Sequence, residues 1–186
     1  MSVRHLHNVG VAEIRTMTTS ETPADLLDAV RGMLDEAFSG SFSDDDWEHA
    51  LGGHHVVMTD EGEVVAHASV VPRQLTIGDD VLRCGYVEAV ATRPSLERRG
   101  HATTAMRVIN RIIADRYELG VLSTGAHGFY ERVGWQRWTG PSYVVETDGS
   151  LHPTPDEDDG IMVLAVKRTF EQSSPIVCEA RLGDDW

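Results

Sequence analysis

The spacing of apolar residues changes from one period to another within residues 81–118. Residues 81–92 form an apolar, β-rich run between turn signals, which predicts a buried strand. From Ala102 onward, apolar residues recur at steps of three, four and seven, which predicts a helix at about 99–118. Gly100 lies between the two elements, where free backbone N–H groups and the positive end of the helix dipole favour an anion. The pattern therefore predicts a strand, a loop and a helix that together bind a phosphate group.

The residues before this stretch carry start and stop signals for a strand and a helix. Residues 1–8 are expected to be disordered, and residues 9–18 can form a first strand. Thr22 is suited to the N-cap of a helix, and Pro23 to its first helical position. The apolar face that follows ends near Gly40, so we expect one helix between these signals.

Shorter elements are expected over the rest of the chain. Ser43 predicts the cap of a second helix that ends near Leu51. Strands are expected at 56–58, 63–71, 74–77, 119–123 and 161–166 (the last as the final strand), with a helix at 126–133, an extended stretch at 135–147, an acidic loop at 148–160 and a tail at 169–186. This order predicts a single domain over residues 1–186. Its fold class is α/β of the α+β type, with a mixed sheet and helices on the faces of the sheet.

The charge balance narrows the possible partners. Thirty acidic residues face sixteen basic ones, which gives a formal net charge of −14. Nucleic acids and anionic membranes attract basic surfaces, so neither is expected as a partner. The acidity fits two interpretations that composition does not separate: a soluble, well-solvated surface, or an acidic cleft that attracts a cationic substrate.

Cysteines, histidines and apolar segments exclude several other classes. The chain has two cysteines, Cys84 and Cys178, too few for a disulfide framework, and this favours a reduced, cytoplasmic protein. No segment has the apolar length of a membrane span, and the N-terminal residues lack the apolar core of a signal peptide. The nine histidines do not combine with cysteines or acids at metal-ligand spacing, so no metal site is expected.

Two sets of motifs resemble a known enzyme family. The loop sequence Glu97-Arg98-Arg99-Gly100-His101-Ala102 resembles the Gln/Arg-x-x-Gly-x-Gly/Ala signature of the GCN5-related N-acetyltransferases (GNAT), although its first position is Glu. The blocks FSGSFSDDDWEHALGG, LRCGYVEAVATR, YELGVLS, GFYERVGW, TPDEDDG and GDDW are similar to the aminoglycoside 2'-N-acetyltransferases. These blocks extend from about residue 38 to residue 186, so the resemblance covers most of the chain.

The resemblance implies a fold, a co-substrate and a partner. It implies the GNAT fold, in which acetyl-CoA binds at a splayed pair of strands, and a homodimer that acetylates the 2'-amine of aminoglycoside antibiotics and so inactivates them. It places the tail 169–186 near the acceptor site. The donor residues implied are backbone groups of Val90, Ala91 and Thr92 for the pantetheine arm, and Arg98, Arg99, Gly100, His101, Ala102 and Thr103 for the phosphates.

The resemblance also points to three catalytic residues. Acetyl transfer to an amine requires a base for the amine and an acid for the departing thiolate. Glu88 lies in an apolar run, where a carboxylate is costly unless it is used or paired, so it is either the base, acting through water, or an ion-pair partner. The terminal carboxylate of Trp186 is a second candidate base, and Tyr130 is the candidate acid. The backbone N–H near Ala89 or Val90 is expected to polarise the thioester carbonyl.

Acceptor residues are expected to be acidic or to form hydrogen bonds. The candidates come from separated segments: Ser41, Asp46, Glu88, Ala89, Ser123, Asp156, Asp158, Asp159 and Asp184. Several carboxylates around one cleft could hold a polycation, whereas a solvated acidic face is the alternative for each of them. Ser41 stands where the family often has Asp, and it either remains a ligand through its hydroxyl or narrows the range of substrates.

Two other functions remain open at this stage. A related acetyltransferase could act on a polyamine, a peptide amine or an amino sugar. A binding module could instead keep the fold and sequester a cation without turnover. Glu97, which replaces the Gln or Arg of the loop signature, slightly favours that alternative.

Overall fold

The structure is a computed structural model, and it describes residues 12–167 and 169–186. The expected disorder of residues 1–8 and the expected strand residues 9–11 lie outside this range. The strands are β1 Glu13–Thr18, β2 His54–Asp60, β3 Glu63–Ile77, β4 Asp80–Thr92, β5 Leu119–Ser123, β6 Gln136–Arg137, β7 Ser142–Val145, β8 Leu151–Pro153, β9 Ile161–Ala165 and β10 Ile176–Glu179. The helices are α1 Ala24–Ala37, α2 Asp44–Ala50, α3 His101–Arg116 and α4 His127–Glu131, with short 3-10 turns η1 Thr19–Glu21, η2 Pro94–Leu96 and η3 Asp158–Gly160.

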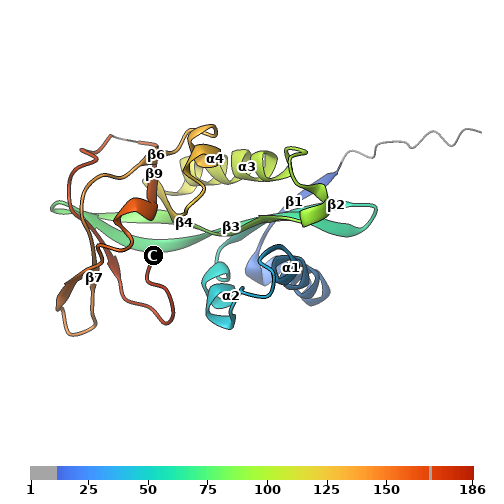
Figure 1. The fold of residues 1–186 in the computed structure, drawn as a ribbon, viewed down its shortest axis with the longest axis horizontal. Coiled ribbons are helices and arrows are strands. Elements are labelled where there is room, and N and C mark those ends of the chain that lie inside the picture. Colours follow the sequence, from blue (N-terminus) through green and yellow to red (C-terminus); the bar gives the residue numbers. More distant parts are fainter. Residues whose placement is uncertain (1–11, 168) are drawn as a thin grey trace, which may run out of the picture.

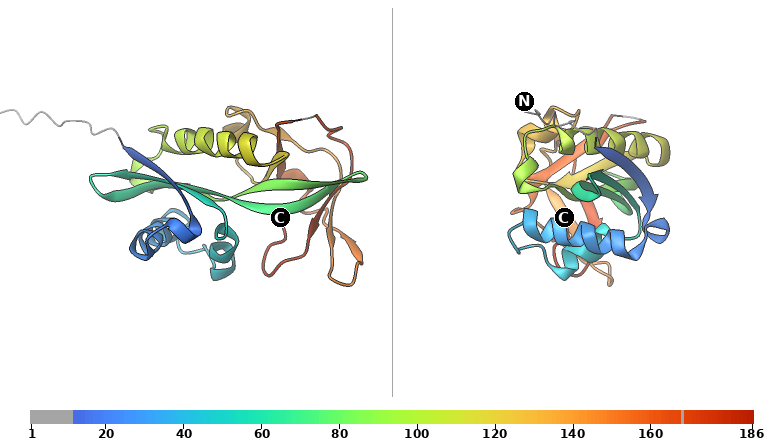
Figure 2. Two further views of the ribbon diagram at one scale, coloured as in Figure 1. Left: turned by 180° about the vertical axis from the view of Figure 1, so that it is seen from behind. Right: turned by 90° about the vertical axis from the view of Figure 1, so that its right-hand side faces the viewer.

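These strands form one mixed sheet with helices on both faces. Their order is β6-β9-β5-β4-β3-β10-β7-β8, and β2 pairs with β3 and β1 with β2. The long strand β3 therefore has β2 beside its first half and β10 beside its second half. Helices α3 and α4 lie on one face, and α1 and α2 lie on the other (Figures 1 and 2). The expected fold class, a mixed central sheet flanked by helices, is confirmed.

The sheet opens between β4 and β5, as the predicted splayed pair requires. The two strands pair in parallel only from Cys84 to Tyr86 on β4, opposite residues 119–121 of β5. Beyond Tyr86, β4 continues to Thr92 and still pairs with β3, but its register with β5 has ended. The edge of β4 over residues 87–92 is therefore available to another extended chain.

The apolar face predicted for α3 is the face that packs on the sheet. Ala105, Met106, Ile109 and Ile113 are fully buried in the cluster between α3 and the strands. Burial of each larger side chain contributes about 1.5–3 kcal/mol, so this face fixes the helix in place. The helix begins at His101 and ends at Arg116, close to the predicted span.

Three expectations about local structure need correction. Pro23, rather than Thr22, is the N-cap of α1, because Thr22 ends the preceding 3-10 turn η1 and its hydroxyl donates to the carbonyl oxygen of Thr18. Strand β9 is not the final strand, since the tail contributes β10, which pairs with both β3 and β7. The strand expected at 63–71 continues as β3 to Ile77 without a break.

One other expectation about local structure is confirmed. Ser43 caps α2 as predicted, with its hydroxyl accepting a hydrogen bond from the Asp46 N–H. Both cysteines are free and buried.

Candidate active site

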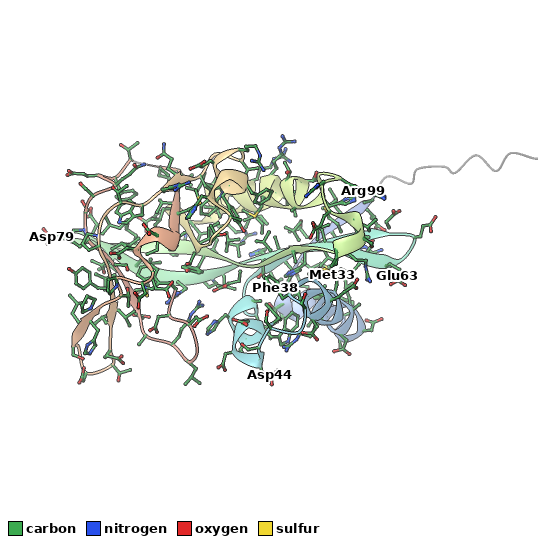
Figure 3. All side chains as sticks on the ribbon, in the orientation of Figure 1. Met33, Phe38, Asp44, Glu63, Asp79 and Arg99 are labelled. Carbon is green, nitrogen blue, oxygen red and sulfur yellow. The ribbon has the colours of Figure 1, made fainter. Side chains whose placement is uncertain are left out.

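A cavity of about 700 Å³ lies along the open edge of β4. Its walls come from β4, from the loop before α3, and from α4. Eight of the nine predicted donor residues line it: Val90, Ala91, Thr92, Arg98, Gly100, His101, Ala102 and Thr103. Arg99 is not among the lining residues, and its exposed side chain lies in the loop ahead of α3, on the same side of the sheet as that helix (Figure 3). We call this space the donor cavity.

The loop before α3 has the geometry of an anion site. Gly100 is the N-cap of α3 with a φ of 86°, and Arg98 also has a positive φ of 62°. These left-handed residues turn the chain sharply into a helix of 16 residues. The N–H groups of its first turn have no carbonyl partner within the helix, so they can bind phosphate oxygens at the positive end of the helix dipole.

Strand β4 bulges at the head of the donor cavity. In its pairing with β3 the register passes from His67↔Ala91 to Ser69↔Glu88, so that Ala89 and Val90 together face a single residue. Ala89 has a φ of 51°, which is unusual for a residue with a side chain.

The carbonyl groups at the bulge both point toward β3. Nδ1 of His67 lies 2.9 Å from the Ala89 oxygen, and the Ser69 hydroxyl donates to the Glu88 oxygen at 3.2 Å. The N–H of a trans peptide points opposite to its carbonyl, so the Ala89 and Val90 N–H groups face the open edge of β4. Two successive N–H groups on one side can stabilise a negative oxygen.

Glu88 forms an ion pair with the tail of the chain. Its Oε1 lies 2.7 Å from Nη1 of Arg181, and only 17% of each side chain is exposed. Arg181 also donates through Nε to the Asp184 carbonyl oxygen and lies over the Tyr86 ring. The ion-pair interpretation of Glu88 is therefore realised in the structure, and it holds the tail against β4.

Tyr130 projects from α4 into the donor cavity. Its ring is buried against Phe129 and Trp135. Burial, and to a smaller extent the negative charge of Glu88, raise the pKa of Tyr130 to about 12. The phenol therefore keeps its proton at neutral pH and is able to donate it.

A second cavity, of about 400 Å³, has an acidic lining. It contains four of the residues predicted for catalysis or for the acceptor, namely Ser123, Asp159, Asp184 and Trp186. They come from the end of β5, from η3 and from the tail, so folding brings distant segments to one place. The indole Nε1 of Trp186 donates to the Thr154 hydroxyl at 3.1 Å, which fixes the ring in the wall. We call this space the acidic cavity.

The two cavities meet at the loop between β5 and α4. Ser123 and His127 line the acidic cavity, whereas Ala126 lines the donor cavity. A group held in one cavity is therefore separated from the other by the width of a single loop.

Comparison with known proteins identifies the family. The model of the acetyltransferase (GNAT) domain matches residues 13–138. The chain belongs to the GNAT acetyltransferase family. An aminoglycoside 2'-N-acetyltransferase of Mycolicibacterium fortuitum is 41% identical over 178 residues, which cover 92% of this chain and 91% of that protein.

Solved structures of other proteins share the fold. The GNAT family N-acetyltransferase YhbS of Escherichia coli, in complex with CoA, superposes with a TM-score of 0.62 at 16% identity, over 90% of this chain and 89% of that one. Eis1 of Mycobacterium abscessus gives a TM-score of 0.59 at 21% identity and covers 72% of this chain. The match covers 33% of Eis1, so this acetyltransferase spans about a third of that longer protein.

Six predicted acceptor residues are not part of either cavity lining. Two of them, Glu88 and Ala89, lie on β4 next to Val90, which does line the donor cavity. The other four lie outside β4. Asp46 receives hydrogen bonds from the Ser43 N–H and hydroxyl and so caps α2. Asp158 accepts from the Ser142 N–H at 2.7 Å and from its hydroxyl at 2.6 Å. The remaining two are Ser41, whose hydroxyl donates to the Phe38 carbonyl oxygen, and Asp156, which is exposed. Their role toward the acceptor stays a prediction, and Asp46 and Asp158 have a structural role as well.

Sequence reasoning missed Glu157, which lines the acidic cavity. Burial raises the pKa of the Glu157 carboxyl, the neighbouring Asp184 raises it further, and a hydrogen bond from Ser123 opposes both. Glu157 lies within the acidic run at 156–159, where composition marks the loop as acidic but not which carboxylates face inward. His127 was also missed, because an isolated histidine carries no pattern; its Nε2 lies 2.6 Å from the Asp159 carbonyl oxygen.

Residues 12–167 and 169–186 contain neither a cluster of metal ligands nor a membrane-spanning helix. No group of three or more His, Cys, Asp or Glu side chains there is arranged to hold a metal ion. None of the helices in the same part of the chain is long and apolar enough to cross a membrane.

Proposed function

We propose that this GNAT acetyltransferase moves the acetyl group of acetyl-CoA to the 2'-amine of aminoglycosides. The observation that carries the proposal is the meeting of a donor cavity with an anion-binding loop and an acidic cavity at residues 123–127. A phosphate-bearing donor and a polycationic acceptor would thus approach each other from opposite sides of one loop. The name of the relative from Mycolicibacterium fortuitum supports the same substrate class.

The donor is expected to bind as an added strand along β4. Main-chain groups of residues 90–92 would pair with the amides of the pantetheine arm, since β5 does not occupy that edge. The pyrophosphate would lie on the N–H groups of the first turn of α3, with Arg98 supplying positive charge in an otherwise acidic protein. The thioester would then lie at the bulge, where the Val90 N–H is oriented toward its oxygen.

The acceptor is expected to bind through several carboxylates at once. Glu157, Asp159 and Asp184 line the acidic cavity, and Ser123 offers a hydroxyl beside them. Each solvent-exposed ion pair contributes only about 0–1 kcal/mol, so affinity for a polycation depends on their number. Neutral amines or peptides with one positive charge would gain little from this arrangement.

The reaction then needs a base, an oxyanion site and an acid. We propose that Oε2 of Glu88, the oxygen not contacted by Nη1 of Arg181, takes the proton of the amine through water. The amine nitrogen attacks the thioester carbon, the Val90 N–H stabilises the oxygen, and the carbon–sulfur bond breaks. Tyr130 gives its proton to the thiolate. The catalytic role predicted for the Trp186 carboxylate stays a prediction.

The substrate assignment is tested by following thiol release from acetyl-CoA with matched drugs. Kanamycin variants that carry either an amine or a hydroxyl at the 2' position differ only at the proposed acceptor atom. Release is expected with the amine and not with the hydroxyl. Release with both would contradict the 2' assignment, and release only with polyamines or peptide amines would replace the substrate class.

A homodimer in the cytoplasm belongs to the same proposal. Two free buried thiols, Cys84 and Cys178, suit a reducing compartment. Exposed apolar side chains at Val81, Leu151 and Leu182 supply candidate contacts between copies. Light scattering after size-exclusion chromatography gives the mass in solution, and a monomer at micromolar concentration would contradict the dimer.

A further inference from the structure

Hydrogen bonds connect the η1 turn to the bulge of β4 through two buried histidines. The Thr19 hydroxyl lies 2.8 Å from Nε2 of His55, and Nδ1 of His55 lies 2.9 Å from Nε2 of His67. Nδ1 of His67 lies 2.9 Å from the Ala89 carbonyl oxygen. Both imidazole rings have 0% exposure. The mechanism described above uses neither ring, so their presence in the core needs another explanation.

The proton positions in this chain of bonds follow from its last member. A carbonyl oxygen can only accept, so Nδ1 of His67 carries a proton, and its Nε2 is an acceptor when the ring is neutral. Nδ1 of His55 must then donate, which leaves Nε2 of His55 as the acceptor for the Thr19 hydroxyl. The Thr19 oxygen in turn accepts from the Gly52 N–H at 2.8 Å. Every donor meets an acceptor in one direction, from Thr19 to Ala89.

Both rings are neutral in the physiological range. Burial lowers the pKa of His55 to about 4 and that of His67 to about 3. The chain of bonds ends on a carbonyl oxygen, which neither gives nor keeps a proton at these pH values. It therefore cannot serve as a base toward substrate. What it can do is fix the direction of one peptide group.

That peptide group is the one between Ala89 and Val90. The left-handed conformation of Ala89 costs about 1–3 kcal/mol and persists only when its surroundings hold it. His67 holds the carbonyl on the β3 side, which turns the Val90 N–H to the donor cavity. If the carbonyl were released, the peptide could rotate and that N–H would leave the cavity.

We propose that His67, oriented by His55 and Thr19, is a positioning residue that keeps the Val90 N–H directed at the thioester oxygen. The inference rests on the proposed acetyl transfer. It adds that the reaction needs His55 on β2, His67 on β3 and Thr19 on η1 to hold the peptide group in place. The outermost member, Thr19, is three hydrogen bonds away from the Ala89 carbonyl oxygen and is absent from the donor and acidic cavity linings.

Three substitutions and a control test this positioning role. His67→Phe keeps an aromatic ring but removes the donor, and His67→Asn retains an amide donor near the place of Nδ1. Thr19→Val removes only the outer hydroxyl. His54→Gln changes the neighbouring histidine of β2, which has no hydrogen bond in this chain of bonds, and serves as the control.

The expected result is a loss in kcat rather than in KM. Loss of one oxyanion donor typically lowers kcat by about 100-fold or more, and this is the loss expected for His67→Phe. His67→Asn should recover most of the rate, Thr19→Val should lose a few-fold, and His54→Gln should lose nothing. The KM for acetyl-CoA and CoA binding by calorimetry should stay near the wild-type values in all four, because the phosphate loop and the β4 edge are unchanged.

The proton directions have a readout that does not depend on activity. Long-range nitrogen–proton NMR spectra of the ¹⁵N-histidine-labelled protein should report two neutral rings protonated at Nδ1. A ring protonated at Nε2 at either position would overturn the proposed orientation.

The outcomes separate this inference from the proposed function. A wild-type protein that releases no thiol with any amine would overturn the function, while the spectra would still test the orientation. An active wild type with an unchanged kcat in folded His67→Phe, or with a loss confined to KM, would overturn the positioning role. If His67→Phe does not fold, Thr19→Val decides, since an unchanged kcat there would contradict the role of the outer members.

Discussion

Glu88 is the point where two segments far apart in the sequence meet. It lies on β4, and its ion-pair partner Arg181 lies 93 residues later in the tail. The apolar run around Glu88 indicated a carboxylate that must be used or paired, and the structure supplies the pair. The same residue thus fastens the tail, which carries Asp184 and Trp186, beside the site where the amine is proposed to arrive.

Replacement of Glu88 tests its role as base. Glu88→Gln should lower kcat by about 10²–10⁴-fold at neutral pH while CoA binding survives, because only the carboxylate can accept the proton. Steady-state kinetics over a pH series gives the measurement. Arg181→Gln is the matched control, since it breaks the same ion pair and keeps the carboxylate. Equal losses in the two variants would mean that Glu88 acts only as an ion-pair partner.

Replacement of Tyr130 tests its role as acid. Tyr130→Phe should lower kcat by about 10²-fold or more with little change in either KM, because the ring stays in the donor cavity and only the proton is lost. Phe129→Leu, a neighbour that lines the same cavity, controls for altered packing. A change in KM alone would assign Tyr130 to substrate positioning.

The buried histidine pair predicts how stability depends on pH. His55 and His67 have lowered pKa values of about 4 and about 3, so between those values and 6.5 the unfolded chain binds more protons than the folded one. The free energy of unfolding that these two neutral histidines contribute is complete above pH 6.5 and is lost as the pH falls toward 4. At pH 5.5 each histidine should lower the free energy of unfolding by about 1.4 kcal/mol relative to its value above pH 6.5.

Urea unfolding at about pH 7.5 and pH 5.5 measures this effect. His55→Asn, which cannot titrate, should lose about 1.4 kcal/mol less between the two pH values than the wild type. The partly buried neighbour His54 stays in both proteins, and so do the charges that act on it from Glu21 and Arg116. Equal losses in the two proteins would contradict the assignment of a neutral, buried His55.

At the scale of elements, a pair of glycines sets how closely α3 approaches the sheet. Gly85 on β4 and Gly120 on β5 are register partners in the short parallel segment. A Cβ at Gly120 would lie 2.9 Å from side-chain carbons of both Ile113 and Trp135, and one at Gly85 would lie 2.8 Å from the Tyr117 ring. These contacts lie at the C-terminal end of α3, so the two glycines set how closely that end of the helix packs on β4 and β5.

A methyl group at this contact should therefore destabilise the fold. Gly120→Ala is expected to lower the free energy of unfolding by about 1–3 kcal/mol through overpacking against Ile113. Gly32→Ala is the matched control: Gly32 is exposed inside α1, nothing lies within 4 Å of its added Cβ, and the change should stabilise by about 0.5–1 kcal/mol. Thermal or urea unfolding of the two variants gives opposite signs if the contact is as described.

At the scale of the whole molecule, three of the thirty acidic residues come together in one cavity. The chain carries −14 overall, and Glu157, Asp159 and Asp184 meet in the acidic cavity while Arg98 lies across the loop in the donor cavity. An acidic cleft raises the local concentration of a polycation and speeds its approach. The acidic cavity supplies a place for the cleft interpretation of the composition, and binding of a cation there stays a prediction.

Salt should weaken the binding of the acceptor more than it slows the chemical step. The KM for an aminoglycoside is expected to rise several-fold when the ionic strength increases from about 0.05 M to about 0.5 M, because screening shortens the reach of the carboxylates. The kcat should change little. Asp159→Asn should show a higher KM and a smaller dependence on salt. A KM that does not respond to salt would contradict an electrostatic acceptor site.

The sequence by itself determined the strand and helix within residues 81–118, the cap at Ser43 and the position of the donor loop. The periods of residues 81–118, the signal at Ser43 and the glycine at position 100 are local patterns, because strands, helices and caps depend on neighbours within a few residues. Motif blocks distributed along the chain indicated the family in the same way, and both the family and the mixed sheet are confirmed.

Only the tertiary structure decided which side chains meet. The Glu88–Arg181 pair, the inward position of Glu157 beside Ser123 and Asp184, the capping role of Asp46, and the strand made by residues 176–179 all depend on contacts between distant segments. The same is true of the link from Thr19 through two histidines to Ala89, which spans four elements. Loop closure and burial bring such partners together, and neither leaves a periodic trace in the sequence.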